Sequence, residues 1–204
     1  MIQLSDRKMR FAGLLETPYL SMMQRNILDY GRWQALKPLI EALKLHSVLD
    51  VGCGLGESSR ACTSGYVGID NSAPHVRYAS RRFPKCRFIL GDGLDLPVQP
   101  RSFDMVMLLD TAHHLTDEQF LSVLGEMTAA SRSWILVSDA VLFKRQPGLS
   151  RLFYSLDRGA EFRNKARLTE LLSLCCDLTL ERVDHFTTFP GLYRRSAFLL
   201  KVIG

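Results

Sequence analysis

Short apolar runs alternate with longer segments whose apolar residues recur every three or four positions along the middle of the chain. Runs of the first kind occupy 48–51, 66–69, 86–90, 103–109 and 134–138. Such nearly continuous apolar runs are typical of parallel strands that are buried on both faces. Segments 74–82 and 116–130 predict amphipathic helices, and Thr116 is the expected N-cap of the longer one. This alternation predicts an α/β fold with a mostly parallel sheet and helices on both of its faces.

The two ends of the chain depart from this alternation. Before the first strand, apolar spacing predicts a helix over Ser21–Leu36 and a second helix that begins at Pro38. After a predicted helix at 169–176, two long strand-like segments, 177–188 and 192–203, are separated by Phe-Pro-Gly, which is a turn signal. We therefore expect an antiparallel hairpin to close the sheet.

A glycine-rich segment, VGCGLGE, follows the first predicted strand directly. Gly52, Gly54 and Gly56 allow a tight turn and a close approach to a ligand, and the helix start behind them would direct free N–H groups at the same ligand. A dinucleotide-binding loop has the spacing G-x-G-x-x-G, whereas Glu57 stands at the place of its last glycine here. Asp50, just before the loop, would repel phosphates and attract an ammonium group. These features disfavour an NAD-dependent enzyme.

Polar residues also follow each of the next three predicted strands. Asp70 is placed to accept hydrogen bonds from both ribose hydroxyls of an adenosine group. Its alternative role is local, because Asn71 and Ser72 precede a helix that Ser72 can cap. Asp92 begins a turn-like segment after the third strand, and Asp110 begins the polar end of the fourth. Since ligands bind at the carboxyl ends of the strands in open α/β sheets, these residues predict one site.

In this order, the segments DVGCGLG, GID, GDGLDLP and FDMVMLLDTAHHL resemble the motifs of the class I S-adenosylmethionine-dependent methyltransferases. The resemblance covers about residues 45–204 and is to the small-molecule branch of the family, of the methyltransferase type 11/25 kind. It implies a Rossmann-like, seven-stranded sheet with an antiparallel last strand. It also implies S-adenosylmethionine as the cofactor and S-adenosylhomocysteine as its product. The cofactor-binding residues that it implies are Asp50, Gly52, Cys53, Gly54, Gly56, Asp70, Asn71, Asp92, Gly93, Leu94, Leu109 and Asp110.

Two neighbouring histidines follow the fourth predicted strand, and the resemblance places them near the acceptor pocket. His113 or His114 is a candidate general base, because the unperturbed pKa of histidine is close to neutral pH. The alternative is that both histidines only hold the loop through hydrogen bonds to the backbone. Asp110 and Asp139 end neighbouring predicted strands, as metal ligands do in catechol-type methyltransferases, but Ala140 follows where a further oxygen ligand is needed. We expect no metal site, although these two carboxylates keep that alternative open.

The resemblance implies a single methyltransferase domain over 1–204 that transfers a methyl group to a small molecule by in-line displacement. The expected acceptor is a phenol, a quinone, a lipid or a polyketide-like compound, methylated on oxygen, nitrogen or carbon. Residues 1–44 would cover the cofactor and acceptor sites, and 141–167 would form a lid whose arginines bind an anion or remain solvated. These arginines are Arg151, Arg158 and Arg163. A methyltransferase acting on RNA or protein and a non-catalytic cofactor-binding protein remain alternatives.

Composition narrows these possibilities only slightly. The 204 residues carry a formal charge of +5 with a pI near 9.1. The basic cluster at 77–87 is interpreted as a solvated helix face, so no nucleic-acid partner is expected. The five cysteines lack zinc-ligand spacing and indicate free thiols in a reducing compartment, for which we predict the cytoplasm. No segment contains the roughly 20 apolar residues that a transmembrane helix needs, and the patterns do not define the oligomeric state.

Overall fold

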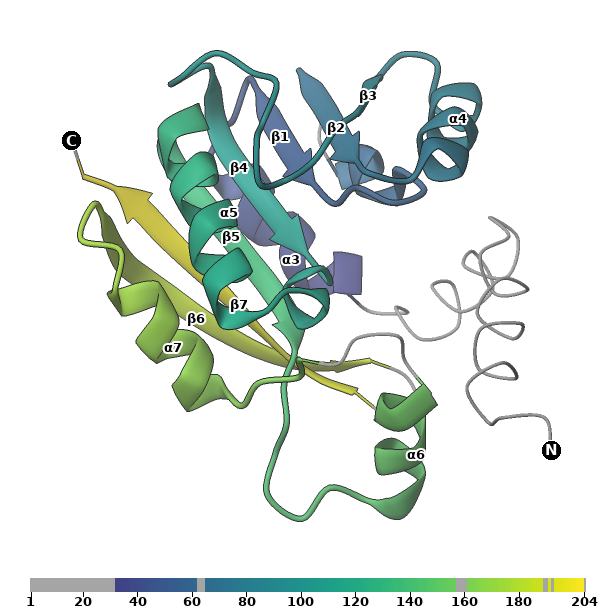
Figure 1. The fold of residues 1–204 in the computed structure, drawn as a ribbon, viewed down its shortest axis with the longest axis vertical. Coiled ribbons are helices and arrows are strands. Elements are labelled where there is room, and N and C mark those ends of the chain that lie inside the picture. Colours follow the sequence, from purple (N-terminus) through teal and green to yellow (C-terminus); the bar gives the residue numbers. More distant parts are fainter. Residues whose placement is uncertain (1–31, 62–64, 157–160, 189–190, 192, 204) are drawn as a thin grey trace, which may run out of the picture.

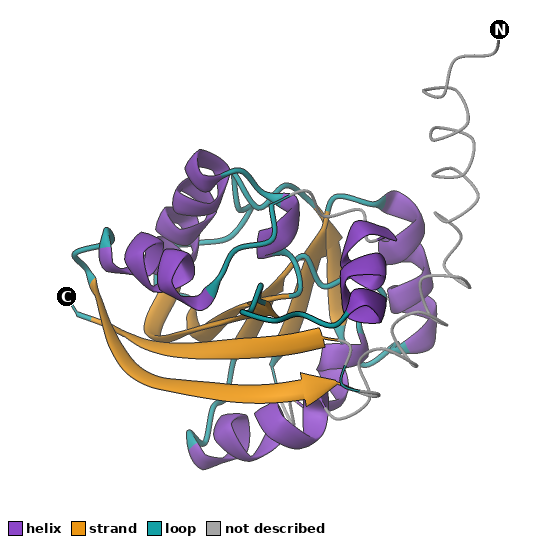
Figure 2. Ribbon diagram, turned by 90° about the horizontal axis from the view of Figure 1, so that it is seen from below, coloured by secondary structure: helices purple, strands orange, loops and turns teal. Residues whose placement is uncertain are grey.

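The structure is a computed structural model, and it describes residues 32–61, 65–156, 161–188, 191 and 193–203. Within these residues, seven strands form a single sheet in the order β3-β2-β1-β4-β5-β7-β6 (Figure 1). The strands are β1 (Val48–Val51), β2 (Tyr66–Asp70), β3 (Arg87–Leu90), β4 (Phe103–Leu109), β5 (Ser131–Ala140), β6 (Leu178–Thr188) and β7 (Tyr193–Val202). Helices cover both faces of this sheet, as Figure 2 shows.

Parallel pairing organises the first five strands. β1 lies between β2 and β4 and is parallel to both, and the pairs β2–β3 and β4–β5 are parallel as well. β7 runs antiparallel to both β5 and β6, which forms the hairpin that the sequence predicts. The predicted α/β class and the antiparallel last strand are thus confirmed. The strand order reverses at β1, and in such sheets the crevice that binds ligands opens at this reversal.

The described part of the chain contains five α-helices and two 3-10 helices, and all of them except the first, which precedes β1, lie between strands. The α-helices are α3 (Arg32–Ala42), α4 (Ala73–Arg82), α5 (Asp117–Ala130), α6 (Gly148–Leu156) and α7 (Lys165–Ser173); the 3-10 helices are η1 (Glu57–Ala61) and η2 (Ala112–His114). α5 and α7 share a core with Leu49 and Val106, whereas α3 shares a second core with Val48 and Met105. Neighbouring residues of one strand therefore enter different cores, as expected of strands buried on both faces. None of these described helices combines the length and the apolar character needed to cross a bilayer.

Helix α5 follows the sequence prediction closely. The Thr116 hydroxyl accepts the Gln119 N–H while the Gln119 side chain accepts the Thr116 N–H, so the two residues form a capping box. Phe120, Leu124 and Met127, which are three or four residues apart, are at most 1% exposed. The helix therefore has a defined start and a continuous apolar face, and it fixes the end of the η2 loop that precedes it.

Helix α3 differs from the prediction at Pro38. The residue does not begin a second helix but lies inside α3. A proline there removes one backbone hydrogen bond, but Leu36, Leu39 and Ile40 continue the same buried face across it. Tertiary packing of that face outweighs the single lost bond, so the helix does not break. Most of the helix predicted over 21–36 lies outside the described residues.

Two further helices also differ from their apolar pattern. Spacing places a helix at 169–176, whereas α7 runs from Lys165 to Ser173. Its start is set by Asn164, whose side-chain oxygen accepts the Arg167 N–H at 2.9 Å. The helix expected behind the glycine loop is only the short 3-10 helix η1. The spacing of apolar residues does not reveal a capping residue that lies outside the apolar face. It also does not reveal a helical turn that is too short to show a repeat.

Leu200 and Leu180 face each other across the β6–β7 pair but differ in burial, at 1% and 40% exposed. We expect Leu200→Ala to lower the free energy of unfolding by about 2–5 kcal/mol, because it removes buried apolar surface and leaves a cavity. Leu180→Ala, the matched control on the edge strand, should cost less than about 1 kcal/mol. Urea unfolding followed by circular dichroism measures both values. Equal losses would contradict the placement of β7 inside the sheet.

Candidate functional site

The loop after β1 is held against β2 by its own backbone. The N–H groups of Gly52 and Cys53 both donate to the Ile69 carbonyl, at 2.8 and 2.9 Å. Gly52 has a φ of +71°, and a Cβ on it would lie 2.5 Å from Oγ1 of Thr111 in the loop after β4. Only glycine meets both the conformational and the steric requirement. The glycine loop therefore contacts the ends of β2 and β4 at once, as the predicted site requires.

Asp70, at the end of β2, carries a buried carboxylate that faces the glycine loop. Its Oδ2 accepts the Gly54 N–H at 2.7 Å, and its Oδ1 accepts the Ser72 N–H at 2.9 Å. Burial acts to raise the pKa of this carboxyl, but hydrogen bonds from His75, Ser72 and Gly54 outweigh burial and lower the pKa below its ordinary value. Asp70 is therefore ionised at neutral pH. Since a carboxylate has about four acceptor positions, these contacts leave room for a ligand hydroxyl.

The residues after Asp70 have different roles from those that the sequence suggests. Ser72 stands at the N-cap position of α4, but its side chain makes no capping hydrogen bond, so the prediction that it caps the helix is wrong. Instead, the Asp70 carboxylate accepts the Ser72 N–H at the start of α4, so Asp70 itself stabilises this end of the helix. Asn71 is exposed beside it.

Asp50 lies in β1 and is 1% exposed. Its Oδ2 accepts hydrogen bonds from the hydroxyls of Ser58 and, at 2.8 Å, Tyr66. Burial and then the charge of Asp50 raise the pKa of Tyr66 well above its usual range, so Tyr66 stays a hydrogen-bond donor. These partners are 8 and 16 residues away along the chain, so no local pattern reveals them. The role of Asp50 toward a ligand's ammonium group stays a prediction.

The turn after β3 lies against the end of β1. Asp92 Oδ1 accepts the Leu94 N–H at 3.0 Å, so the aspartate closes an Asx turn. Between these residues, Gly93 approaches β1 so closely that an added Cβ would lie 3.0 Å from Cγ1 of Val51. Asp92 is exposed, and Leu94 is 37% exposed. The turn is thus adjacent to the residue that precedes the glycine loop, while contact of Asp92 with a ligand stays a prediction.

Asp110, directly after β4, pairs with Arg195 of β7. Their side chains are 9% and 6% exposed, so two opposite charges neutralise each other away from water. Asp110 also has a φ of +52°, and its N–H donates to the Ser138 carbonyl at 2.8 Å. Leu109 beside it is 4% exposed. The ion pair gives Asp110 a structural role that the sequence did not indicate, and the cofactor contacts of both residues stay predictions.

A buried histidine–carboxylate pair joins the ends of β4 and β5. Asp139 is 1% exposed; its Oδ1 lies 2.6 Å from Nδ1 of His113, and its Oδ2 accepts the His113 N–H at 2.9 Å. His113 is 6% exposed, and its ring stacks on Phe162 with centroids 4.8 Å apart and planes within 5°. His114 is exposed, with its ring centroid 4.1 Å from that of His113. The structure therefore separates two histidines that the sequence treats alike, because His113 is buried against the Asp139 carboxylate whereas the His114 side chain is exposed.

Asp110 and Asp139 have different partners. The first pairs with Arg195 and the second binds His113. Among the described residues, no group of three or more histidine, cysteine, aspartate or glutamate side chains is arranged to hold a metal ion. The two carboxylates therefore face different partners and do not face a common cation, and the alternative of a metal site gains no support.

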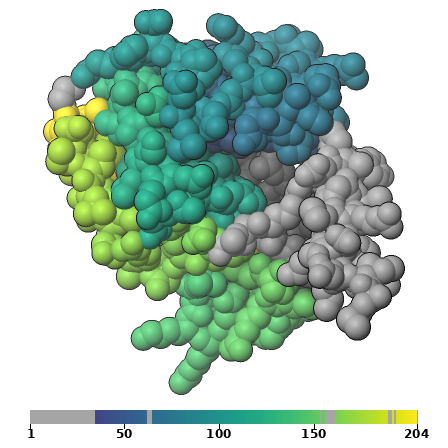
Figure 3. Space-filling model, viewed as in Figure 1, coloured from purple at the N-terminus to yellow at the C-terminus, as the bar shows by residue number. Residues whose placement is uncertain are grey.

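An aromatic cluster connects the predicted lid to His113. Phe162, which stacks on His113, lies with its ring centroid 4.6 Å from that of Tyr154, and Tyr154 lies 4.6 Å from Tyr193 of β7. The Tyr154 hydroxyl donates to the Val141 carbonyl at 3.0 Å. Helix α6, which carries Tyr154, projects beyond the carboxyl ends of β4 and β5 (Figures 1 and 3). These contacts bring part of the 141–167 segment to the histidine loop.

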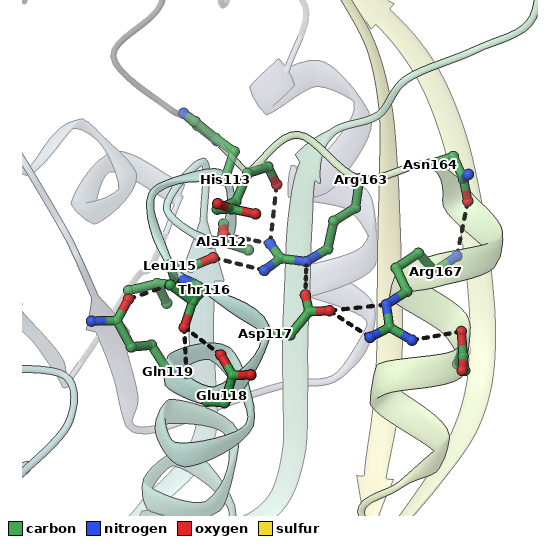
Figure 4. A network of polar contacts seen from close by, with 12 residues as sticks. Ala112, His113, Leu115, Thr116, Asp117, Glu118, Gln119, Arg163, Asn164 and Arg167 are labelled. Atoms are coloured by element: carbon green, nitrogen blue, oxygen red, sulfur yellow. Dashed lines mark hydrogen bonds and ion pairs between the residues drawn. The ribbon is translucent and has the colours of Figure 1, made fainter.

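The arginines of the same segment are not placed as the sequence suggests. Arg163, predicted to bind an anionic ligand or to remain solvated, is instead 7% exposed and donates to the Asp117 carboxylate and to carbonyls of the η2 loop (Figure 4). Arg151 is exposed, and its Nε donates to a backbone carbonyl at 3.0 Å. Arg158 lies outside the described residues. The segment therefore contains a buried arginine that binds other parts of the protein, whereas an arginine available to a ligand or to solvent was predicted.

Comparison with known proteins agrees with this fold. The crystal structure of magnesium protoporphyrin IX methyltransferase from Synechocystis PCC 6803 with bound SAH shares the fold, with a TM-score of 0.68 over 87% of this chain and 86% of that chain, at 17% identity. Residues 48–133 match the family model of a methyltransferase domain. This segment of the chain is therefore similar to a methyltransferase domain, in a fold that the Synechocystis enzyme shares. The glycine loop, Asp70 and the end of β4 all lie within the matched segment.

Two curated relatives are similar to part of this chain. Tocopherol O-methyltransferase of Arabidopsis thaliana is 31% identical over 109 residues, which is 48% of this chain and 31% of that protein. The 2-methyl-6-phytyl-1,4-hydroquinone methyltransferase of Synechocystis is 34% identical over 79 residues, which is 35% of this chain and 25% of that protein. The similarity thus spans about a third or less of the length of these relatives.

We expect Gly52→Ala to destabilise the protein by about 1–3 kcal/mol, because the new Cβ meets Thr111 and an L-residue is strained at this positive φ. Gly125→Ala is the matched control, since Gly125 lies in α5 with nothing within 4 Å of an added Cβ. That substitution should stabilise by about 0.5–1 kcal/mol. Thermal unfolding of both variants measures the difference. Shifts of Tm in the same direction would contradict the contact between the glycine loop and Thr111.

Proposed function

We propose that this chain transfers the methyl group of S-adenosylmethionine to a small molecule, in the first place a phenol or hydroquinone. The observation that carries the proposal is the ionised, buried carboxylate of Asp70 beside the glycine loop. Such a carboxylate binds the hydroxyl groups of a ribose strongly and in a fixed orientation. Similarity to methyltransferases supports S-adenosylmethionine as the ligand. The glycine spacing and Asp50 also disfavour a dinucleotide.

The cofactor would lie across the carboxyl ends of β1, β2 and β4. Its ribose would bind Asp70, its adenine amino group would bind Asp92, and its ammonium group would be attracted by the charge of Asp50, whose carboxylate is already held by two hydroxyls. Backbone can approach the cofactor closely at Gly52, where no Cβ intervenes. The other proposed contacts are Cys53, Gly54, Gly56, Asn71, Gly93, Leu94, Leu109 and Asp110. The bound cofactor supplies an electrophilic methyl group on a sulfonium.

His113 would act as the general base on the acceptor hydroxyl. Because Nδ1 of His113 faces the Asp139 carboxylate at 2.6 Å, the ring proton belongs on Nδ1 and Nε2 is the basic nitrogen. As the new bond from the acceptor oxygen to the methyl carbon forms and the carbon–sulfur bond breaks, the hydroxyl proton passes to Nε2. Correct placement of the two reactants supplies much of the rate. His114, exposed beside this ring, is the second candidate.

The acceptor class rests on two observations. The relatives described above are named for a tocopherol and for a phytyl hydroquinone, both of which carry an aromatic hydroxyl. In this chain, the cluster of Phe162, Tyr154 and Tyr193 lies beside the proposed base. We propose that residues 141–167 form the acceptor lid and that residues 1–44 complete the cover within one domain.

The cytoplasm remains our proposed location. Three of the described cysteines, Cys86, Cys175 and Cys176, are free thiols, which suits a reducing compartment. The tocopherol relative, in contrast, is described as chloroplastic.

Labelled methyl transfer tests the function. Protein and methyl-labelled S-adenosylmethionine are incubated with host extract, which is then separated into organic-soluble, RNA and protein fractions. We expect label in the organic-soluble fraction, and His113→Ala should lower kcat for the product by about 10²–10⁴-fold without changing the Kd of S-adenosylmethionine. His114→Ala is the control with the smaller effect. Label in RNA or protein would support those acceptors instead, and confirmed cofactor binding without any label would indicate a non-catalytic binder.

Asp70→Ala should weaken S-adenosylmethionine binding by about 1–3 kcal/mol, because the ribose hydroxyls lose a charged acceptor. Asp177→Ala is the control, since that carboxylate is exposed just before β6 and away from the glycine loop. Isothermal titration calorimetry gives both dissociation constants. An unchanged constant for Asp70→Ala would remove the observation that carries the proposed function.

A further inference from the structure

The side chain of Arg163 enters the loop that carries the two histidines. Its Nη1 donates to the Ala112 carbonyl at 2.8 Å, and its Nη2 donates to the Leu115 carbonyl at 2.7 Å (Figure 4). Ala112 and Leu115 stand on either side of His113 and His114. One planar group therefore holds both ends of the histidine turn.

The buried cation is neutralised by Asp117, the first residue of α5. Nε of Arg163 donates to Asp117 Oδ1 at 2.6 Å, and Nε of Arg167 donates to Oδ2 at 3.0 Å. Hydrogen bonds from Arg167 and then Arg163 lower the pKa of the Asp117 carboxyl below its ordinary value, so its charge persists at neutral pH. Arg163 also lies over the Phe120 ring, 5.6 Å from its centroid. Because the guanidinium presents its donors as a rigid fork, a lysine cannot span the same three acceptors.

The backbone next to Arg163 adds further contacts to the histidine turn. The Glu161 N–H donates to the His113 carbonyl at 3.1 Å, while Arg163 Nη1 donates to the Glu161 carbonyl at 3.2 Å. The Leu142 N–H donates to the Arg163 carbonyl at 2.9 Å. Leu142 lies shortly after β5, which carries Asp139. This hydrogen bond therefore links the backbone of Arg163 to the strand whose carboxylate orients His113.

We propose that Arg163 is a positioning residue for methyl transfer: it fixes the turn 112–115 so that His113 keeps its contact with Asp139 and presents Nε2 to the acceptor. This inference rests on the function proposed above. Arg163 acts through His113, so its loss should change turnover and the state of the His113 ring. Affinity for S-adenosylmethionine should persist, because Asp70 and the glycine loop follow β2 and β1, whereas Arg163 holds the loop after β4.

Kinetics of Arg163 variants test this role. Arg163→Met should lower kcat by about 10–100-fold while the Kd of S-adenosylmethionine stays within about twofold of the wild-type value. Arg163→Lys keeps the charge but not the fork and should lose most of the same rate. Arg167→Met is the matched control, because the Arg167 side chain shares Asp117 with Arg163 and, among the described residues, otherwise pairs with Glu170 of its own helix. Adding Arg163→Met to His113→Ala should lower kcat little beyond the loss caused by His113→Ala alone, since Arg163 acts through His113.

Nuclear magnetic resonance of the histidine rings gives a readout that needs no acceptor. In the wild type and in Arg167→Met, His113 should show a proton on Nδ1; in Arg163→Met, this signal should be lost or averaged between two tautomers. The inference would be overturned if Arg163→Met left both the His113 ring signals and kcat unchanged. It would also be overturned if the loss of kcat in the double variant were the product of the two single losses. If Arg163→Met does not fold, Arg163→Lys decides by the same readouts. A wild type that binds S-adenosylmethionine but methylates nothing would overturn the proposed function instead, and the ring signals would still decide whether Arg163 positions His113.

Discussion

Parallel pairing of β1 with β2 on one side and with β4 on the other is the constraint on which the site depends. Val51, the last residue of β1, is level with Ile69 in β2 and with Leu108 in β4. The chain therefore leaves all three strands at the same height, and the residues that follow, among them Gly52 and Asp70, emerge side by side. The hydrogen bonds from the glycine loop to the Ile69 carbonyl and the contact of Gly52 with Thr111 follow from this register.

Buried charge is the second constraint, because a carboxylate removed from water is costly unless it is paired or hydrogen-bonded. Four aspartates at the sheet meet it in different ways. Asp50 accepts from hydroxyls, Asp110 pairs with an arginine, and Asp139 binds a histidine. Asp70 accepts the backbone N–H groups of Gly54 and Ser72, and Nδ1 of His75 lies 3.4 Å from its Oδ1. Asp70 is therefore the carboxylate best suited to bind the uncharged hydroxyl groups of a ribose, whereas the other three are bound by side chains of the protein.

The sequence predicted the fold well because its information there is local. Continuous apolar runs, a capping box at Thr116 and a turn signal before the last strand each report on neighbouring residues. The partners of the site are distant instead: Arg163 and Asp117 are 46 residues apart, and Asp50 and Tyr66 are 16 residues apart. Since arginines are mostly exposed, pattern alone places Arg163 in solvent, and only the tertiary arrangement of carbonyls and a carboxylate explains its burial. The two histidines look alike in the sequence for the same reason, because the carboxylate that orients His113 belongs to the next strand.

The two halves of the proposed site differ in what fixes them. The cofactor half depends on strand register and on backbone conformation, which a short motif encodes and which related proteins can share. The acceptor half depends on side chains from α6, from the segment before α7 and from β7, which no single motif specifies. His113 stands where the halves meet: its backbone belongs to the loop after β4, while its ring stacks on Phe162. Changes in the acceptor half can therefore reach the proposed base through Phe162 and Arg163 and alter the choice of acceptor, while the residues that bind the cofactor remain in place.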